Sequence, residues 1–148
     1  MGFGRILSVT DISASGLAAE RLRMEVAANN IANSNSTRTP EGGAFRRKQV
    51  VFAAAYENAL RASFGDDARQ FRGVTVTGIQ PDSSEMPRIH KPGHPDADAD
   101  GFVTFPNVSL PNEMVDLITA SRSYEANLRA LKSFREIVQQ ALSLLRGA

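Results

Sequence analysis

Residues 112–145 read NEMVDLITASRSYEANLRALKSFREIVQQALSLL and decide the fold, because one heptad position is apolar or aromatic through five consecutive repeats. That position holds Leu117, Tyr124, Leu131, Val138 and Leu145. Neighbouring apolar positions widen this seam, namely Met114, Leu128, Phe134, Ala141 and Leu142. A helix of this length extends about 50 Å, which exceeds what a compact domain of this size needs. We therefore expect partner chains to share the seam.

The ends of this helix are also encoded. Ser109 or Asn112 can cap its start, and Pro111 is tolerated only within the first turn. Glu113 suits the positive end of the helix dipole. The sequence predicts a helix from about Asn112 to Leu145.

A second long helix is expected from about Phe3 to Asn33, where there is no proline. One helical face carries Leu17, Met24, Ala28 and Ile31. A second, weaker stripe on nearly the opposite side carries Ile12, Ala19 and Val26. Two stripes indicate neighbours in two directions, unless both face one intramolecular core.

The segment between the helices is predicted to be a small β-rich insert. Residues 33–43 have a loop composition, whereas residues 49–52, 73–79 and 102–105 have strand patterns. Residues 53–64 favour a helix by propensity. The basic cluster of Arg46, Arg47 and Lys48 is interpreted as the solvated edge of a strand.

The predicted fold class is α+β and mainly helical, with the terminal helices pairing as an antiparallel coiled coil. The expected divisions are an N-terminal assembly helix over residues 1–35, a loop and small β-rich insert over 36–108, and a C-terminal coiled-coil helix over 109–148.

Composition excludes several classes of protein. The chain has 148 residues, with 17 basic and 16 acidic side chains and a formal charge of +1, which disfavours nucleic acid as a partner. It contains no cysteine, which removes disulfides and thiol catalysis. The longest apolar run, residues 50–56, is too short to span a membrane. Asp11 and Ser13 interrupt the first apolar run, so we expect no cleaved signal peptide.

Two constellations resemble metal sites. Asp96, Asp98, Asp100 and Gly101 reproduce the first half of a calcium loop, but Asn107 occupies the position of the bidentate glutamate. The alternatives are a calcium-binding module and a solvated acidic turn. His90 and His94 have the spacing of a helical zinc pair, but Pro92 lies between them and favours a rigid turn. We expect no catalytic site, cofactor or metal, and therefore no enzyme.

Motifs at both ends of the chain resemble the axial rod and hook proteins of the bacterial flagellum. The first is Ala28-Asn29-Asn30-Ile31-Ala32-Asn33, and the second comprises Glu113-Met114-Val115 and Tyr124-Glu125-Ala126-Asn127. The run from His90 to Val103 resembles the C-type, proximal members of the basal-body rod family. Its signature turn contains Pro92, Gly93, His94, Pro95, Asp96, Asp98 and Gly101.

This resemblance implies a structural subunit of the proximal rod, the periplasm-spanning drive shaft that transmits torque. Its implied partners are other rod subunits, copies of itself, the junction between the membrane ring and the rod, and the type III export apparatus. No small-molecule substrate or membrane insertion is implied. The resemblance also implies that the terminal helices order on assembly and that export leaves the N-terminus intact.

On this reading the assembly interface uses both terminal segments. In the N-terminal segment it comprises Leu17, Met24, Ala28, Asn29, Asn30, Ile31 and Asn33. In the C-terminal segment it comprises Glu113, Leu117, Tyr124, Asn127, Leu128, Leu131, Phe134, Val138 and Leu145. For Asn33, a role in assembly and a role as a C-terminal helix cap both remain open.

Overall fold

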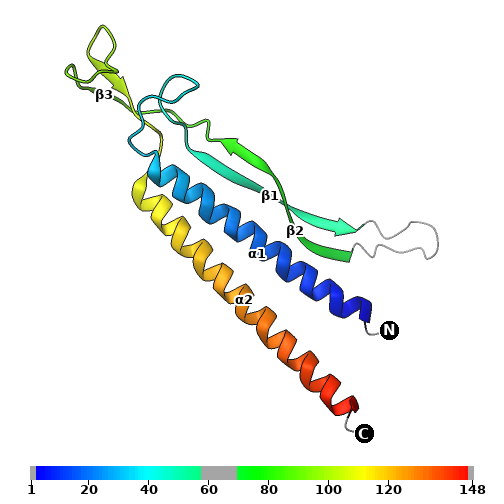
Figure 1. Ribbon diagram of the computed structural model, residues 1–148. Coiled ribbons are helices and arrows are strands. Elements are labelled where there is room, and N and C mark those ends of the chain that lie inside the picture. The colour runs from blue at the N-terminus through cyan, green and yellow to red at the C-terminus, as the bar shows by residue number, and fades with distance from the viewer. Residues whose placement is uncertain (1–2, 58–69, 147–148) are drawn as a thin grey trace. The chain divides into compact units, whose positions relative to one another are not determined.

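The computed structural model describes residues 3–57 and 70–146, and the side chains of residues 10–54 and 73–144. Two long helices enclose a β insert in chain order (Figure 1). The elements are α1 (Phe3–Ala32), β1 (Lys48–Glu57), β2 (Gln70–Pro81), β3 (Arg88–His90), β4 (Phe102–Thr104) and α2 (Leu110–Arg146). The predicted fold class is confirmed, because two long terminal helices contact each other and the insert consists of antiparallel strands.

The helix predictions are confirmed closely, with α2 beginning at Leu110, slightly earlier than expected. The backbone N–H of Glu113 donates to the carbonyl of Ser109 at 3.0 Å, which marks the first turn. No helix in the described part of the chain is long and apolar enough to cross a membrane.

The strand predictions need two corrections. Residues 53–57 continue β1, so the predicted helix over 53–64 is wrong there, and residues 58–64 lie outside the described residues. Pairing with β2 outweighs the helix propensity of the alanines in that stretch. Strand β3 was not predicted, since its three residues are too short to display a period. It pairs with β4 through Arg88 with Thr104, Ile89 with Val103, and His90 with Phe102.

The chain forms two compact units, whose borders fall within both helices. Unit 1 comprises the described residues of Met1–Arg21, Phe52–Thr77 and Ser121–Ala148. Unit 2 comprises Leu22–Val51 and Gly78–Ala120. Each unit contains a part of α1 beside a part of α2. The linear division into residues 1–35, 36–108 and 109–148 stays a prediction.

In unit 1, glycine permits two close approaches. A Cβ atom at Gly16 would lie 3.2 Å from Nδ2 of Asn127, so α1 and α2 are nearly in contact there. Gly73 is buried with φ of +109°, and a Cβ on it would overlap the Ser15 hydroxyl. The Ser15 hydroxyl also accepts a hydrogen bond from the Val74 N–H at 3.1 Å. Strand β2 is thus held against α1.

In unit 2, the apolar core draws on both helices and the insert. Its buried members are Val26, Ala27, Phe45, Val103 and Ala120. Val103 and Ala120 are 1% and 0% exposed. Two polar side chains, Asn30 and Glu113, are buried just as deeply, at 1% each. Because burial without hydrogen bonds is costly, these two residues require partners, which are described next.

Candidate assembly interface

Asn30 near the end of α1 binds the backbone of β1. Its Oδ1 accepts from the Lys48 N–H at 3.0 Å, and its Nδ2 donates to the Lys48 carbonyl at 2.8 Å. Nδ2 also donates to Oε2 of Glu113 at 2.9 Å. The carboxamide therefore pairs with β1 as a neighbouring strand would and joins α1 to α2 at the same time. Asn30 and Glu113, one from each terminal motif, meet inside one chain.

Arg47 completes this polar clamp, which we define as Asn30, Arg47, Asp82, Glu113 and Asp116. Its guanidinium donates through Nε to Oε1 of Glu113, through Nη1 to Asp82 at 3.3 Å, and through Nη2 to Asp116 at 3.5 Å. The hydrogen bond to Glu113 and the attraction of its charge raise the pKa of Arg47, against an opposing effect of burial. The planar donor fork of arginine suits several carboxylates at once.

The environment of Asp82 also favours its charged form. Hydrogen bonds from the Ser84 N–H and side chain, followed by those from Arg47, lower the pKa of Asp82 below its ordinary value. The contacts between Arg47 and Asp82 therefore favour the charged forms of both side chains. Asp116 also forms an ion pair with Arg23 of α1, whose Nη2 lies 3.2 Å from Oδ1 of Asp116.

Sequence reasoning missed Arg47 and Asp82. The prediction of a solvated strand edge is wrong for Arg47, whose side chain is only 23% exposed, whereas Lys48 is exposed. The available signal was the alternation of the strand, which turns Arg47 and Lys48 to opposite sides. No spacing in the sequence connects Arg47 with Asp82 and Glu113.

Asn33 lies just beyond the end of α1 and forms local hydrogen bonds. Its N–H and its Nδ2 donate to the Asn29 carbonyl at 3.1 and 2.9 Å, and its Oδ1 accepts from the Ser36 hydroxyl. These contacts terminate the helix, as the capping alternative expects. A further role in assembly stays a prediction for Asn33, and also for Asn29, which is exposed.

The predicted face of α1 is covered unequally. Leu17, Met24 and Ile31 are half-buried and Ala28 is exposed, whereas Ala19 and Val26 of the weaker stripe are buried. The second stripe therefore belongs to the interior of this chain.

The seam of α2 is only partly covered by its own chain. Half-buried members are Leu117, Tyr124, Asn127, Leu128, Leu131, Phe134 and Val138. Met114 and Leu142 were predicted to widen the seam, but they are 50% and 48% exposed, and Ala141 is exposed as well. The side chain of Leu145 lies outside the described residues.

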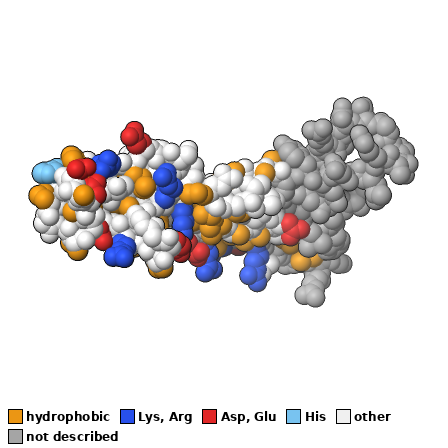
Figure 2. All heavy atoms as spheres, turned by 90° about the horizontal axis from the view of Figure 1, so that it is seen from above, with side chains coloured by type: hydrophobic (Ala, Val, Ile, Leu, Met, Phe, Trp, Pro, Cys, Tyr) orange, Lys and Arg blue, Asp and Glu red, His pale blue; other side chains and the backbone are white. Residues whose placement is uncertain are grey.

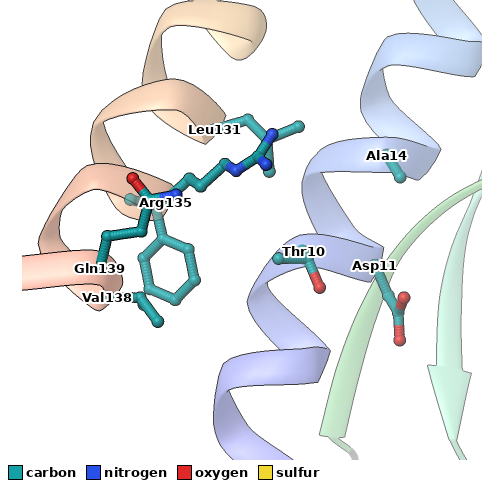
Figure 3. Close-up of a pocket in the computed structure, with 8 residues that line it drawn as sticks. Thr10, Asp11, Ala14, Leu131, Arg135, Val138 and Gln139 are labelled. Carbon is teal, nitrogen blue, oxygen red and sulfur yellow. The ribbon is translucent and has the colours of Figure 1, made fainter. Parts of the chain in front are cut away.

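An open groove separates the two helices within unit 1 (Figure 3). It has a volume of about 460 Å³ and is lined from α2 by Leu131, Phe134 and Val138 and from α1 by Ala14. Arg135 extends from α2 toward α1, and Thr10 and Asp11 of α1 also line the groove, although the Asp11 carboxylate is directed away from α2 (Figure 3). The helices that almost touch at Gly16 and Asn127 thus leave three seam residues facing open space.

The signature turn is held by hydrogen bonds from its own unit. Asp96 accepts from the Thr37 hydroxyl at 2.8 Å, and Asp98 pairs with Arg88 and accepts from the Phe102 N–H at 2.8 Å. The Phe102 N–H and Arg88 lower the pKa of Asp98. Gly101 is buried with φ of +78°, a conformation that glycine adopts without strain.

Other members of the turn lie at the surface. Pro92, Gly93 and Pro95 are exposed, and His94 is half-buried. The only histidines in the sequence are His90 and His94, so the pale blue side chains in Figure 2 mark this turn among acidic, basic and apolar neighbours. Over the described residues, no three potential metal ligands come together. The carboxylates of Asp96 and Asp98 face protein donors, which is the geometry of an acidic turn.

Comparisons with known proteins agree with this architecture. The family described as "Flagella basal body rod protein" matches residues 11–38, and "Flagellar basal body rod FlgEFG protein C-terminal" matches residues 99–144. These matches contain Asn30 and Glu113, the two buried polar residues that meet in the clamp.

Full-length relatives are similar along nearly the whole chain. The flagellar basal-body rod protein FlgC of Borreliella burgdorferi is 39% identical over 96% of this chain and 99% of its own length. FlgC of Salmonella typhimurium is 37% identical over 94% and 97%, and FlgC of Bacillus subtilis is 35% identical over 90% and 94%. The chain therefore belongs to the FlgC family of flagellar basal-body rod proteins, which are structural subunits and not enzymes.

Proposed function

We propose that this FlgC-family subunit joins the proximal part of the rod through its terminal helices and there helps to transmit torque across the periplasm. The observation that carries the proposal is the groove of unit 1, where Leu131, Phe134 and Val138 face space that their own chain leaves open. Apolar surface of this kind gains stability when a neighbour covers it. Neighbouring rod subunits and copies of this chain are the proposed partners.

The clamp supports a mechanical role for unit 2. Arg47 precedes β1, Asp82 follows β2, and Glu113 and Asp116 lie in the first turns of α2. A single guanidinium therefore links the insert to α2, and Asn30 links both to α1. Such cross-links would let a turning force on the helices pass to the insert without a change of register. We also propose that this subunit contacts the junction between the membrane ring and the rod.

We further propose that the chain leaves the cytoplasm through the flagellar type III export apparatus with its N-terminus retained. Support comes from membership of the FlgC family. Mass spectrometry of the chain isolated from basal bodies would test this, because a cleaved N-terminus would contradict it.

Leu131→Asp tests assembly through the seam. In the bacterium that carries this gene, with its own copy deleted, we expect the variant to be exported but not incorporated into rods. Burying an unpaired carboxylate in the seam costs at least several kcal/mol. Lys132→Asp is the matched control, because Lys132 is the exposed neighbour of Leu131. Normal filaments with Leu131→Asp would refute assembly through this seam.

A further inference from the structure

We infer that Met114 is an oxidation site, at which a hydroperoxide converts the thioether to a sulfoxide. The sulfoxide makes an exposed apolar patch of α2 polar while unit 2 stays folded. The patch is defined as Leu110, Met114, Val115 and Ile118, near the start of α2. The inference concerns the surface of a single chain and does not depend on the proposed function.

The patch forms because the start of α2 buries only one of its faces. Glu113 faces the interior and is 1% exposed. Leu110, Met114 and Ile118 follow one another at intervals of four residues, which places them along one side of the helix. They are 45%, 50% and 56% exposed, and Val115 beside them is 63% exposed. Met114 is thus the central member of an apolar stripe.

Met114 is also the most accessible methionine among the described side chains. The sequence has four methionines, of which Met1 lies outside the described residues. Met24 in α1 and Met86 before β3 are half-buried, whereas Met114 is exposed. All three belong to unit 2, so they provide an internal comparison. Because a peroxide must reach the sulfur to oxidise it, Met114 should react first.

The chemistry at this thioether has no faster competitor in the chain. The sequence contains no cysteine, so no thiolate consumes the oxidant first. The sulfur lone pair attacks one oxygen of hydrogen peroxide, so that an S–O bond forms and the O–O bond breaks. The hydroxyl proton of the transferred oxygen passes to the departing hydroxide, which leaves as water. The sulfur gives up two electrons, and the peroxide takes them.

The sulfoxide should change the surface of unit 2 and not its interior. Its oxygen is polar and accepts hydrogen bonds, which favours contact with water. Met114 is already 50% exposed, and the clamp is formed by other side chains, such as Asn30, Arg47 and Glu113. The new oxygen can therefore be solvated without breaking a clamp hydrogen bond. Oxidation interrupts the apolar stripe at its centre and leaves the fold in place.

Peptide mass spectrometry of the purified full chain tests the site. After a brief treatment with hydrogen peroxide, each methionine-containing peptide is scored for the gain of one oxygen atom. We expect Met114 to be oxidised at least about fivefold faster than Met24 and Met86. The control is the same chain in concentrated urea, where the three should react at similar rates because no fold covers them. Equal rates without urea would overturn the inference.

Hydrophobic-interaction chromatography tests the change of surface. The oxidised chain should elute earlier than the untreated chain, with an unchanged Tm. Methionine sulfoxide reductases A and B, which act on the two sulfoxide epimers, should together restore the elution. In that reversal a dithiol supplies two electrons and becomes a disulfide, and the oxygen leaves as water.

Met114→Leu is the matched variant for the chromatography, because leucine keeps the apolar surface but has no sulfur. Its elution should not change after peroxide treatment. Three results contradict the inference: no shift in the native chain, an equal shift in Met114→Leu, or a lower Tm of the oxidised native chain.

Discussion

The side chain of Asn30 hydrogen-bonds to both backbone groups of Lys48, donating to its carbonyl at 2.8 Å and accepting from its N–H at 3.0 Å. A carboxamide has the same donor and acceptor as a peptide group, so it can occupy the place of a missing strand. This pairing explains why an asparagine is buried at 1% exposure near the end of α1.

Asn30→Asp should therefore destabilise unit 2. Aspartate keeps the acceptor but loses the donor to Lys48, and it places a second carboxylate beside buried Glu113. We expect the free energy of unfolding, measured in urea, to fall by about 2–4 kcal/mol. Asn29→Asp, at the exposed neighbour, should change it by less than about 0.5 kcal/mol. Equal losses for the two variants would show that the clamp contributes nothing specific.

Arg47→Lys should also weaken the clamp although it keeps the positive charge. An ammonium lacks the planar fork with which Arg47 reaches Glu113, Asp82 and Asp116. We expect a loss of about 1–3 kcal/mol in the same unfolding experiment. Lys48→Arg, at the exposed next position, is the control. If Arg47→Lys left the free energy of unfolding unchanged, the positive charge alone would account for the interaction.

The stability of the clamp should depend on pH with a definite sign. Hydrogen bonds from Ser84, and then from Arg47, lower the pKa of Asp82 in the folded chain. The stabilisation is therefore complete above the unfolded value of about 3.9 and is lost as the pH falls through the lower folded value. Asp82→Asn should flatten the decline of Tm in this acidic range, whereas Asp100→Asn, at an exposed position, should leave it steep. An unchanged decline in Asp82→Asn would contradict this assignment.

Gly73→Ala should destabilise unit 1 more than an ordinary glycine replacement. Gly73 has φ of +109°, and a Cβ there would overlap the Ser15 hydroxyl. Backbone strain alone costs about 1–3 kcal/mol. Gly78→Ala is the matched control, because its added Cβ would meet nothing within 4 Å and no positive φ is involved. Thermal unfolding that reports equal Tm values for both variants would rule out a close approach of β2 to α1.

The sequence allowed much of the fold to be predicted, because the cues for long helices are local and repetitive. The heptad spacing from Leu117 to Val138 indicated α2, and the strand alternation after Lys48 indicated β1. The prediction of a helix after residue 53 was wrong because pairing of β1 with β2 outweighs the helix propensity of Ala53 and its neighbours.

The clamp could not be predicted, since its members come from four separated segments. Strand alternation separates Arg47 from exposed Lys48, but no local pattern pairs Arg47 with Glu113. Likewise, Ala120 is fully buried, yet a small side chain carries little signal in an apolar pattern. The roles of the seam residues in assembly stay predictions, because they depend on contacts between molecules.

The clamp ties Asn30 of α1, Arg47 beside β1 and Glu113 of α2 into one hydrogen-bonded group. Asn30 and Glu113 lie 83 positions apart in the sequence, so neither side chain finds this partner until almost the whole insert has been made. A chain that ends before α2 therefore leaves the carboxamide of Asn30 and the guanidinium of Arg47 without Glu113. Unit 2 can close only when the start of its second helix is present.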